Sequence, residues 1–382
     1  VDGIGQYGGT LRRGFTGPGD HNNYTRVVYD ALVRHAPDGS EVIPHIAKGW
    51  ESNDDFTEWT VFLRDGMKWS DGEPFTADDI LFWYDHILLN EDLNPTPPGW
   101  MLNADGSVAN VEKIDETTVK WTFGQPNTAF LLDLANKDGA DRAISNLAFV
   151  PAHYLMDFHP DLADEAELQA KVDESGFDTW VELFAVHAFP HVSGARPSTA
   201  AWAPNGTSTS DQVFTITRNP YYFAVDPEGN QLPYIDEVRF TFFADLETLN
   251  LGAVAGEIDM QGRHIQMSSY PVLKENEGDG NYHVITWPTF GGSDAVVMFN
   301  QTWIANDPVM GALVQEKDFR VAQSHAIDRN AIKESAFFGI GEARQPVPAP
   351  FHPYYPGDEY AFKYTEFDPD TANALLDGIG LT

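Results

Sequence analysis

The chain contains no cysteine, and this absence excludes several kinds of chemistry. Thiol nucleophiles, disulfide frameworks, and zinc or iron–sulfur sites held by cysteine are all ruled out. The absence of cysteine does not identify the cellular compartment, because a chain without disulfides can function on either side of a membrane.

Basic residues are scarce as well. The chain has 23 Lys and Arg against 58 Asp and Glu, which gives a formal net charge of −35 at pH 7. A chain this acidic repels phosphate backbones, so we expect no nucleic-acid partner. The acidic residues form no block of five or more, which favours a solvated acidic surface over a cation-binding field.

Long apolar runs are also missing. No stretch approaches the roughly 18 uninterrupted apolar residues of a membrane-spanning helix. The chain is nevertheless 42% hydrophobic and 13% aromatic, and its 382 residues are enough for two or three folded units. Val1 stands where a chain would begin with Met. Removal of a secretory leader explains this start, and so does an artificially chosen one.

Strand and helix patterns follow one another without a strict βαβ period, which predicts an α/β chain with inserted elements. Thr76 has capping-box spacing to Asp79, and Trp59, Val61 and Leu63 alternate as in a half-buried strand. The expected helices span 24–34, 77–90, 246–255, 318–338 and 368–378. The expected strands span 59–63, 111–114, 118–123, 213–217, 234–243, 282–287 and 295–300.

Motifs for catalysis or cofactors are largely absent. Residues 3–8 match G-x-G-x-x-G, but no strand precedes them and an extended segment follows, so we expect no dinucleotide site. His187 and His191 have the i,i+4 spacing of metal ligands. Pro190 argues against a continuous helix there, which favours packed or surface histidines. We therefore predict neither a metal nor a cofactor.

One stretch carries a family resemblance. Residues 62–80 read FLRDGMKWSDGEPFTADDI, which closely resembles a signature of the extracytoplasmic solute-binding proteins of peptide, nickel and oligosaccharide ABC importers, known as solute-binding protein family 5. Further similar segments are Tyr29–Val33 (YDALV), Gly256–Asp259 (GEID), Asp318–Arg329 and Asp368–Leu376.

The resemblance implies a fold. We expect a two-lobed, type II periplasmic-binding-protein-like α/β fold with an extra inserted subdomain. Members of the family are usually longer, so the chain resembles a truncated member whose second lobe is incomplete. The implied parts are 1–44 and 211–285 for the first lobe, 45–210 for the inserted subdomain and 286–382 for the start of the second lobe.

The resemblance also implies a function without catalysis. We expect a monomeric, periplasmic or otherwise extracytoplasmic protein, secreted with its leader removed. It would enclose an oligopeptide between its lobes and deliver it to an ABC permease in the membrane. An oligosaccharide is the alternative ligand, because Asn219–Tyr222 and Glu228–Asp236 resemble a subgroup that includes sugar binders. A sensory or chaperone-like peptide binder and a carboxylate-based glycoside hydrolase are more distant alternatives.

Candidate ligand contacts come from loops at strand ends. Arg263 is placed to pair with a ligand carboxylate, and Trp287 to serve as a stacking platform. Each candidate also has a plain packing interpretation. The full set is Phe15, His21, Asn22, Tyr24, Gln261, Arg263, His264, Trp287, Phe290 and Ser293.

Overall fold

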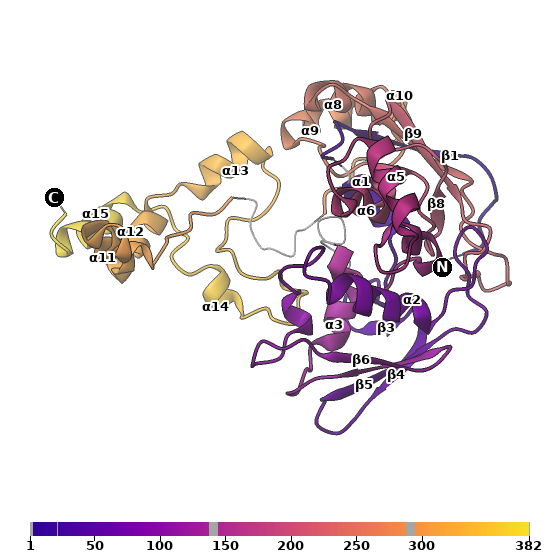
Figure 1. The fold of residues 1–382 in the computed structure, drawn as a ribbon. Coiled ribbons are helices and arrows are strands. Elements are labelled where there is room, and N and C mark those ends of the chain that lie inside the picture. Colours follow the sequence, from indigo (N-terminus) through magenta and orange to yellow (C-terminus); the bar gives the residue numbers. More distant parts are fainter. Residues whose placement is uncertain (1–2, 21, 137–143, 288–294, 382) are drawn as a thin grey trace. The chain divides into compact units, whose positions relative to one another are not determined.

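The computed structural model describes residues 3–20, 22–136, 144–287 and 295–381 (Figure 1). The chain divides into two compact units, Val1–Ile265 and Gln266–Thr382, and each is considered by itself. The expected division of the chain into four parts remains a prediction. In the described residues, no helix combines the length and the apolar character that a bilayer crossing requires.

The first unit contains a mixed four-stranded sheet in the order β1-β10-β9-β8. β1 runs parallel to β10, and the other neighbours are antiparallel. The alternation of side chains along β1 turns Phe15 toward Phe214, with ring centroids 5.0 Å apart, and Gly14 toward Leu249 of the helix α8 (Leu246–Val254). The strands are β1 (Thr10–Phe15), β8 (Trp202–Pro204), β9 (Val213–Arg218) and β10 (Glu237–Phe242).

A second sheet of the same unit is antiparallel, with the strand order β4-β5-β7-β6. Trp59, Val61 and Leu63 are buried on one face of β5, which confirms the expected alternation. A two-stranded ribbon, β2-β3, accompanies it. The strands are β2 (Val33–His35), β3 (Val42–Pro44), β4 (Ala47–Ser52), β5 (Glu58–Leu63), β6 (Asn110–Asp115) and β7 (Thr118–Thr122).

Helices cover these sheets. The predicted capping box is confirmed at the start of α2. The Thr76 side chain accepts the backbone N–H of Asp79, and the Asp79 side chain accepts the backbone N–H of Thr76. The helices of this unit are α1 (Asn22–Val28), α2 (Ala77–Phe82), α3 (Phe130–Ala135), α4 (Ala152–Leu155), α5 (Glu165–Ser175), α6 (Trp180–Ala188), α7 (Pro190–Ser193) and α8 (Leu246–Val254). α2 continues directly into a π-helical stretch, η1 (Trp83–Leu88), and the single 3-10 turns are η2 (Gly99–Met101), η3 (Ile144–Asn146) and η4 (Met156–Phe158).

Regular structure in the described residues of the second unit is helical. α12 packs against α15, and the backbone N–H of Asp368 donates to the His325 carbonyl at 2.9 Å. The helices are α9 (Tyr270–Glu275), α10 (Glu277–Gly280), α11 (Pro308–Gln315), α12 (Lys317–His325), α13 (Arg329–Phe337), α14 (Asp358–Ala361) and α15 (Pro369–Gly378), with turns η5 (Met267–Ser269) and η6 (Trp303–Ala305).

Four expectations for the elements are wrong. Residues 282–287 and the described residues 295–300 are irregular, and among the residues that the structure describes no strand pairs with them. The helix expected at 24–34 ends at Val28 and is followed by a strand. The helix expected at 318–338 is interrupted after His325, where the Asp328 side chain caps α13 by accepting the Ala331 N–H at 2.9 Å.

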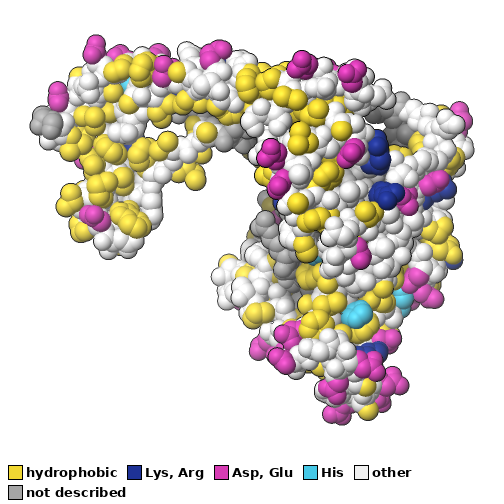
Figure 2. Space-filling model, turned by 90° about the horizontal axis from the view of Figure 1, so that it is seen from above, with side chains coloured by type: hydrophobic (Ala, Val, Ile, Leu, Met, Phe, Trp, Pro, Cys, Tyr) yellow, Lys and Arg dark blue, Asp and Glu magenta, His cyan; other side chains and the backbone are white. Residues whose placement is uncertain are grey.

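The surface agrees with the composition. On the face shown in Figure 2, Asp and Glu side chains lie in small groups over the whole visible area, among few Lys and Arg. This distribution is the one expected of a solvated acidic surface.

Candidate functional site

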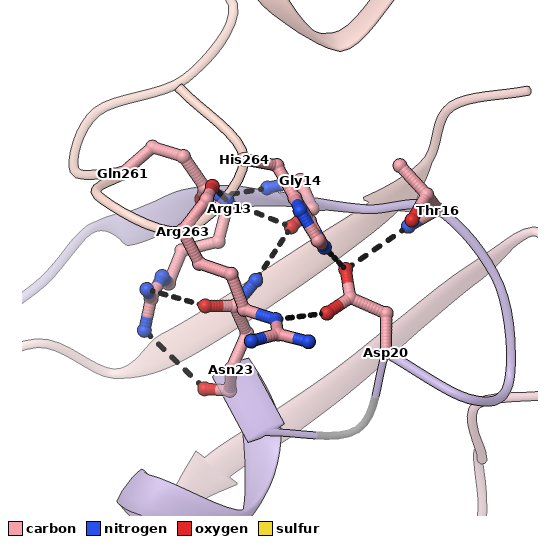
Figure 3. A network of polar contacts seen from close by, with 8 residues as sticks. All are labelled: Arg13, Gly14, Thr16, Asp20, Asn23, Gln261, Arg263 and His264. Carbon is pink, nitrogen blue, oxygen red and sulfur yellow. Dashed lines mark hydrogen bonds and ion pairs between the residues drawn. The ribbon is translucent and has the colours of Figure 1, made fainter. Parts of the chain in front are cut away.

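A buried carboxylate, Asp20, lies at the centre of a polar network in the first unit (Figure 3). Its side chain is 5% exposed and follows the end of β1 by five residues. The backbone N–H of Thr16 donates to its Oδ2 at 3.2 Å, and its own N–H donates to the Gly17 carbonyl at 2.9 Å. These contacts fix the loop between β1 and α1 around the carboxylate.

Two basic side chains from a distant segment, Arg263 and His264, lie against this carboxylate. The Nε of Arg263 donates to Oδ1 of Asp20. Nε2 of His264 lies 2.9 Å from Oδ2, an ion-pair distance without the geometry of a hydrogen bond. The Arg263 side chain is 36% exposed, and among the described residues its two terminal amino groups have no hydrogen-bond partner (Figure 3). Asp20 thus orients an arginine whose outer donors are available.

Gln261 ties this segment to β1. Its Oε1 accepts the Gly14 N–H at 3.3 Å, and its Nε2 donates to the carbonyls of Gly14 at 3.2 Å and Arg263 at 2.8 Å. A Cβ on Gly14 would lie 3.0 Å from the ring of Phe243, so the close approach here favours glycine. The amide therefore sets the position of the strand end and of the arginine together.

Asn23 and Arg13 extend the network below. The Asn23 Nδ2 donates to the Gly14 carbonyl at 3.2 Å, and Nη2 of Arg13 donates to the Asn23 Oδ1 at 3.1 Å. Burial lowers the pKa of the Arg13 guanidinium. These two residues join α1 to β1 (Figure 3).

The backbone at His264 is unusual. Its φ of 68° is left-handed, which is uncommon for a residue with a side chain. Nδ2 of Asn250, in α8, donates to the His264 carbonyl at 2.8 Å and to the Leu246 carbonyl at 2.7 Å. A strained conformation held by surrounding contacts is a common feature of ligand-binding sites.

The structure brings together three of the residues proposed from sequence, Gln261, Arg263 and His264. Phe15 and Tyr24 have buried rings, and both ring centroids lie within 5.2 Å of the Phe214 ring centroid. Burial raises the pKa of Tyr24, and its hydroxyl donates to a backbone carbonyl at 3.0 Å. As placed, these two side chains belong to the hydrophobic core of the first unit.

The remaining proposed residues divide into three groups. Trp287 belongs to the second unit and is 76% exposed. Of Asn22, the structure describes only the backbone at the start of α1. His21, Phe290 and Ser293 lie outside the described residues.

Sequence reasoning missed Asp20, Asn23 and Arg13. The sequence does contain one local indication of these residues, which is the polar turn directly after the β1 segment. Its partner could not be found in the same way, because Asp20 and Arg263 are 243 positions apart.

Residues 219–236, which suggested a sugar ligand, make most of their polar side-chain contacts within their own loop. Nε2 of Gln231 donates to the carbonyls of Pro220 at 2.9 Å and Tyr222 at 2.8 Å. The Tyr234 hydroxyl donates to the Asp226 carboxylate. These contacts explain the motif as a structural feature of the fold.

Two histidines with ligand-like spacing do not share a helix. α6 ends at Ala188 and α7 begins at Pro190, as expected from that proline. The His187 ring stacks on Phe158 with centroids 3.7 Å apart, and His191 is buried. Likewise, the glycine-rich residues 3–8 precede strand β1 and no helix, so they offer no phosphate site.

Comparison with known proteins identifies the family. The model of the family described as "Bacterial extracellular solute-binding proteins, family 5 Middle" matches residues 41–382. The chain is 28% identical to the periplasmic alpha-galactoside-binding protein of Rhizobium meliloti (strain 1021), over 100% of the chain and 54% of that protein. The chain thus spans about half the length of the curated relatives it matches.

Solved structures agree on the fold. One, titled oligopeptide-binding protein OppA, is 36% identical with a TM-score of 0.80 over 100% of this chain and 58% of that one. Another, the periplasmic binding protein MelB of Agrobacterium fabrum C58 in complex with stachyose, is 25% identical with a TM-score of 0.66, over 100% of this chain and 56% of that one. The expected type II periplasmic-binding-protein fold is therefore confirmed. The chain belongs to the bacterial extracellular solute-binding proteins of family 5.

Proposed function

We propose that the chain is part of the extracytoplasmic substrate-binding component of an ABC importer and that it captures an oligopeptide. The observation that carries this proposal is Arg263, which buried Asp20 holds by Nε while its outer amino groups stay available. An arginine oriented in this way is a preformed donor for a peptide carboxylate or carbonyl. Binding then shifts the protein toward a ligand-enclosing state that a permease recognises.

The similarity to the structure titled oligopeptide-binding protein supports a peptide, since its 36% identity exceeds the 28% to the alpha-galactoside-binding relative. The second candidate is an oligosaccharide. It is favoured by that same relative and by the MelB complex with stachyose. Donors such as Arg263 and Gln261 serve sugar hydroxyls as well as peptide groups.

The network is suited to binding rather than to hydrolysis. A glycoside hydrolase of the common type needs two carboxylates flanking the scissile bond. Among the described residues of this network, Asp20 supplies the single carboxylate, and both of its oxygens already have partners. A second acid for proton transfer is not provided within it.

Relatives point to the location of the protein. The alpha-galactoside-binding and nickel-binding relatives are named as periplasmic proteins. We infer that this chain also works outside the cytoplasm, as a monomer that meets its permease at the membrane surface. Its surface charge gives it no attraction to an anionic bilayer.

The experiment is a thermal-shift and calorimetric screen of the chain with di- to hexapeptides and with cello-, xylo-, manno- and galacto-oligosaccharides. A ligand at 100 times its Kd stabilises by about 2.7 kcal/mol. We expect peptides to stabilise the chain and Arg263→Gln to weaken their binding at least tenfold. Arg239→Gln is the matched control, because it removes the same charge from an exposed position of β10.

The outcomes separate the candidates. A peptide whose C-terminus is amidated should bind less well to the wild type, and this difference should vanish in Arg263→Gln. Stabilisation by sugars alone would replace the first candidate by the second. If Arg263→Gln binds its ligand as the control does, the network is not the binding site.

A further inference from the structure

Two histidines and an aspartate of the first unit meet away from the Asp20 network and share no residue with it. His86 lies in η1, His159 follows η4, and Asp161 is two residues further on. One donor atom from each lies within 4.8 Å of the other two, and this is the one group of such residues in the described part of the chain. Nδ1 of His86 is 4.0 Å, and Nδ1 of His159 is 3.9 Å, from Oδ2 of Asp161.

The protonation of His159 can be assigned from its neighbours. Its Nε2 lies 3.1 Å from the His86 carbonyl, which can only accept a hydrogen bond. Its Nδ1 lies 3.3 Å from the backbone N–H of Asp161, which can only donate. The amide Nδ2 of Asn90, 3.3 Å from Nε2, is the single contact that favours the other tautomer. Two contacts against one therefore place the proton on Nε2.

In this tautomer the Nδ1 lone pair faces Asp161, where it accepts the Asp161 backbone N–H at 3.3 Å, so a metal ion bound to Nδ1 would replace that hydrogen bond. A metal-ligating histidine usually donates its other ring N–H to a carbonyl or carboxylate, which fixes the ring and its tautomer. The contact from Nε2 to the His86 carbonyl has this form, and it comes from the backbone of the second histidine.

Aromatic side chains hold the two imidazoles in place. His159 is fully buried, with its ring centroid 5.2 Å from Trp180 and 5.9 Å from Phe184. The His86 ring meets it at 5.0 Å and an angle of 69°. The Asp161 side chain is 69% exposed and has freedom to move. The group thus combines a rigid buried ligand, a second imidazole and an adjustable carboxylate at the surface.

We propose that His86, His159 and Asp161 bind a divalent transition-metal ion, with Zn²⁺ as the reference ion. Imidazole nitrogen with one carboxylate suits this class of ion, whereas Mg²⁺ and Ca²⁺ prefer oxygen ligands. A tetrahedral site with bonds of about 2.0–2.1 Å places neighbouring donors roughly 3.4 Å apart. The two distances from imidazole to Asp161 must shorten by about half an ångström, which movement of the exposed Asp161 side chain can supply. The donors of His86 and His159 lie within 4.8 Å of each other, and any approach between them needs movement of the less buried His86 ring. Water completes the coordination.

The test is calorimetric titration of the tag-free chain with ZnCl₂ in a non-chelating buffer, with MgCl₂ at the same ionic strength. We expect one Zn²⁺ per chain and, for Mg²⁺, only weak binding that salt suppresses. His86→Gln and Asp161→Asn should each weaken Zn²⁺ binding at least tenfold. The matched control, His35→Gln, removes an exposed imidazole from β2 and should bind as the wild type does.

Substituting Co²⁺ gives a second readout, since its visible absorption reports nitrogen coordination. The test relies on His86 and Asp161, because replacing the buried His159 risks unfolding the unit. Equal Zn²⁺ affinity in wild type, His86→Gln and Asp161→Asn would overturn the proposal, as would equal binding of Zn²⁺ and Mg²⁺. Because the group shares no residue with the Asp20 network, neither result bears on the peptide proposal.

Discussion

Asp20 and Arg263 form a hydrogen-bonded ion pair between a loop near the N-terminus and a segment 243 positions later. The carboxylate is almost fully buried, while the guanidinium is about one third exposed. The carboxylate therefore depends on this partner and on His264 to offset its desolvation. We therefore expect the two side chains to act as one unit in stability, and we propose the same for ligand recognition.

Substituting Asp20→Asn should show this dependence. We expect a loss of unfolding free energy of about 1–3 kcal/mol, because the amide no longer compensates the cation and cannot match both acceptor contacts. Equilibrium denaturation of Asp20→Asn, Arg263→Gln and the double variant measures the coupling. Additive effects, within about 0.5 kcal/mol, would mean that the two side chains act independently.

Asp79 should make stability depend on pH. Burial raises its pKa to about 6, although the N–H groups of Thr76 and Ala152 favour the charged form. Since the folded-state pKa lies above that of the unfolded chain, near 4, its contribution is fully present below pH 4 and is lost as pH rises through 6. Relative to Asp79→Asn, the wild type should lose roughly 2–3 kcal/mol between pH 4 and 7. Parallel stability curves of the two proteins over this range would contradict the prediction.

Gly311 should resist substitution. A Cβ at this position of α11 would lie 2.2 Å from the Cα of Ile304 in η6, so the backbones must move apart. We expect Gly311→Ala to destabilise the second unit by about 2 kcal/mol or more. Gly278→Ala is the matched control, because the same methyl group there meets open space in α10. Equal midpoints of chemical denaturation for the two variants would show that the contact can relax.

Arg196 should tolerate loss of its charge. It is buried, its guanidinium lies 5.6 Å from the centre of the Tyr29 ring, and no ion pair of Arg196 exists among the described residues. Burial lowers the pKa of this guanidinium. Arg196→Met keeps most of the volume and removes the buried charge, so we expect stability equal to or up to about 2 kcal/mol above the wild type. Arg196→Ala, which leaves a cavity, should be less stable than both in thermal unfolding. A large loss in the methionine variant would reveal a partner for the charge.

Elements set by local patterns were predictable from the sequence. The capping box of Thr76 and Asp79 and the alternation from Trp59 to Leu63 depend on residues a few positions apart, and both are confirmed. The strands expected at 282–287 and 295–300 are wrong, because forming a strand depends on residues far away in the sequence. A strand exists only where a partner lies beside it, and a single sequence does not contain that information.

The candidate site was predictable in part. Gln261, Arg263 and His264 were proposed from their place after a segment resembling the family, and the structure joins them in one network. Phe15 and Tyr24 were proposed as ligand contacts, and the structure places them in the core, because β1 and α1 turn these rings toward Phe214. The central carboxylate, Asp20, was not proposed, since it is one acid among 58.

The parallel pairing of β1 with β10 has a consequence for folding. Thr10 pairs with Glu237, which lies 227 positions later, so this ladder closes one of the longest loops in the chain. Contacts of such high sequence separation slow folding, because the loop must be ordered before the pairing contributes. During synthesis the first strand waits, unpaired, until β10 has been made. The Asp20 network, which depends on that strand, can therefore form only late in folding.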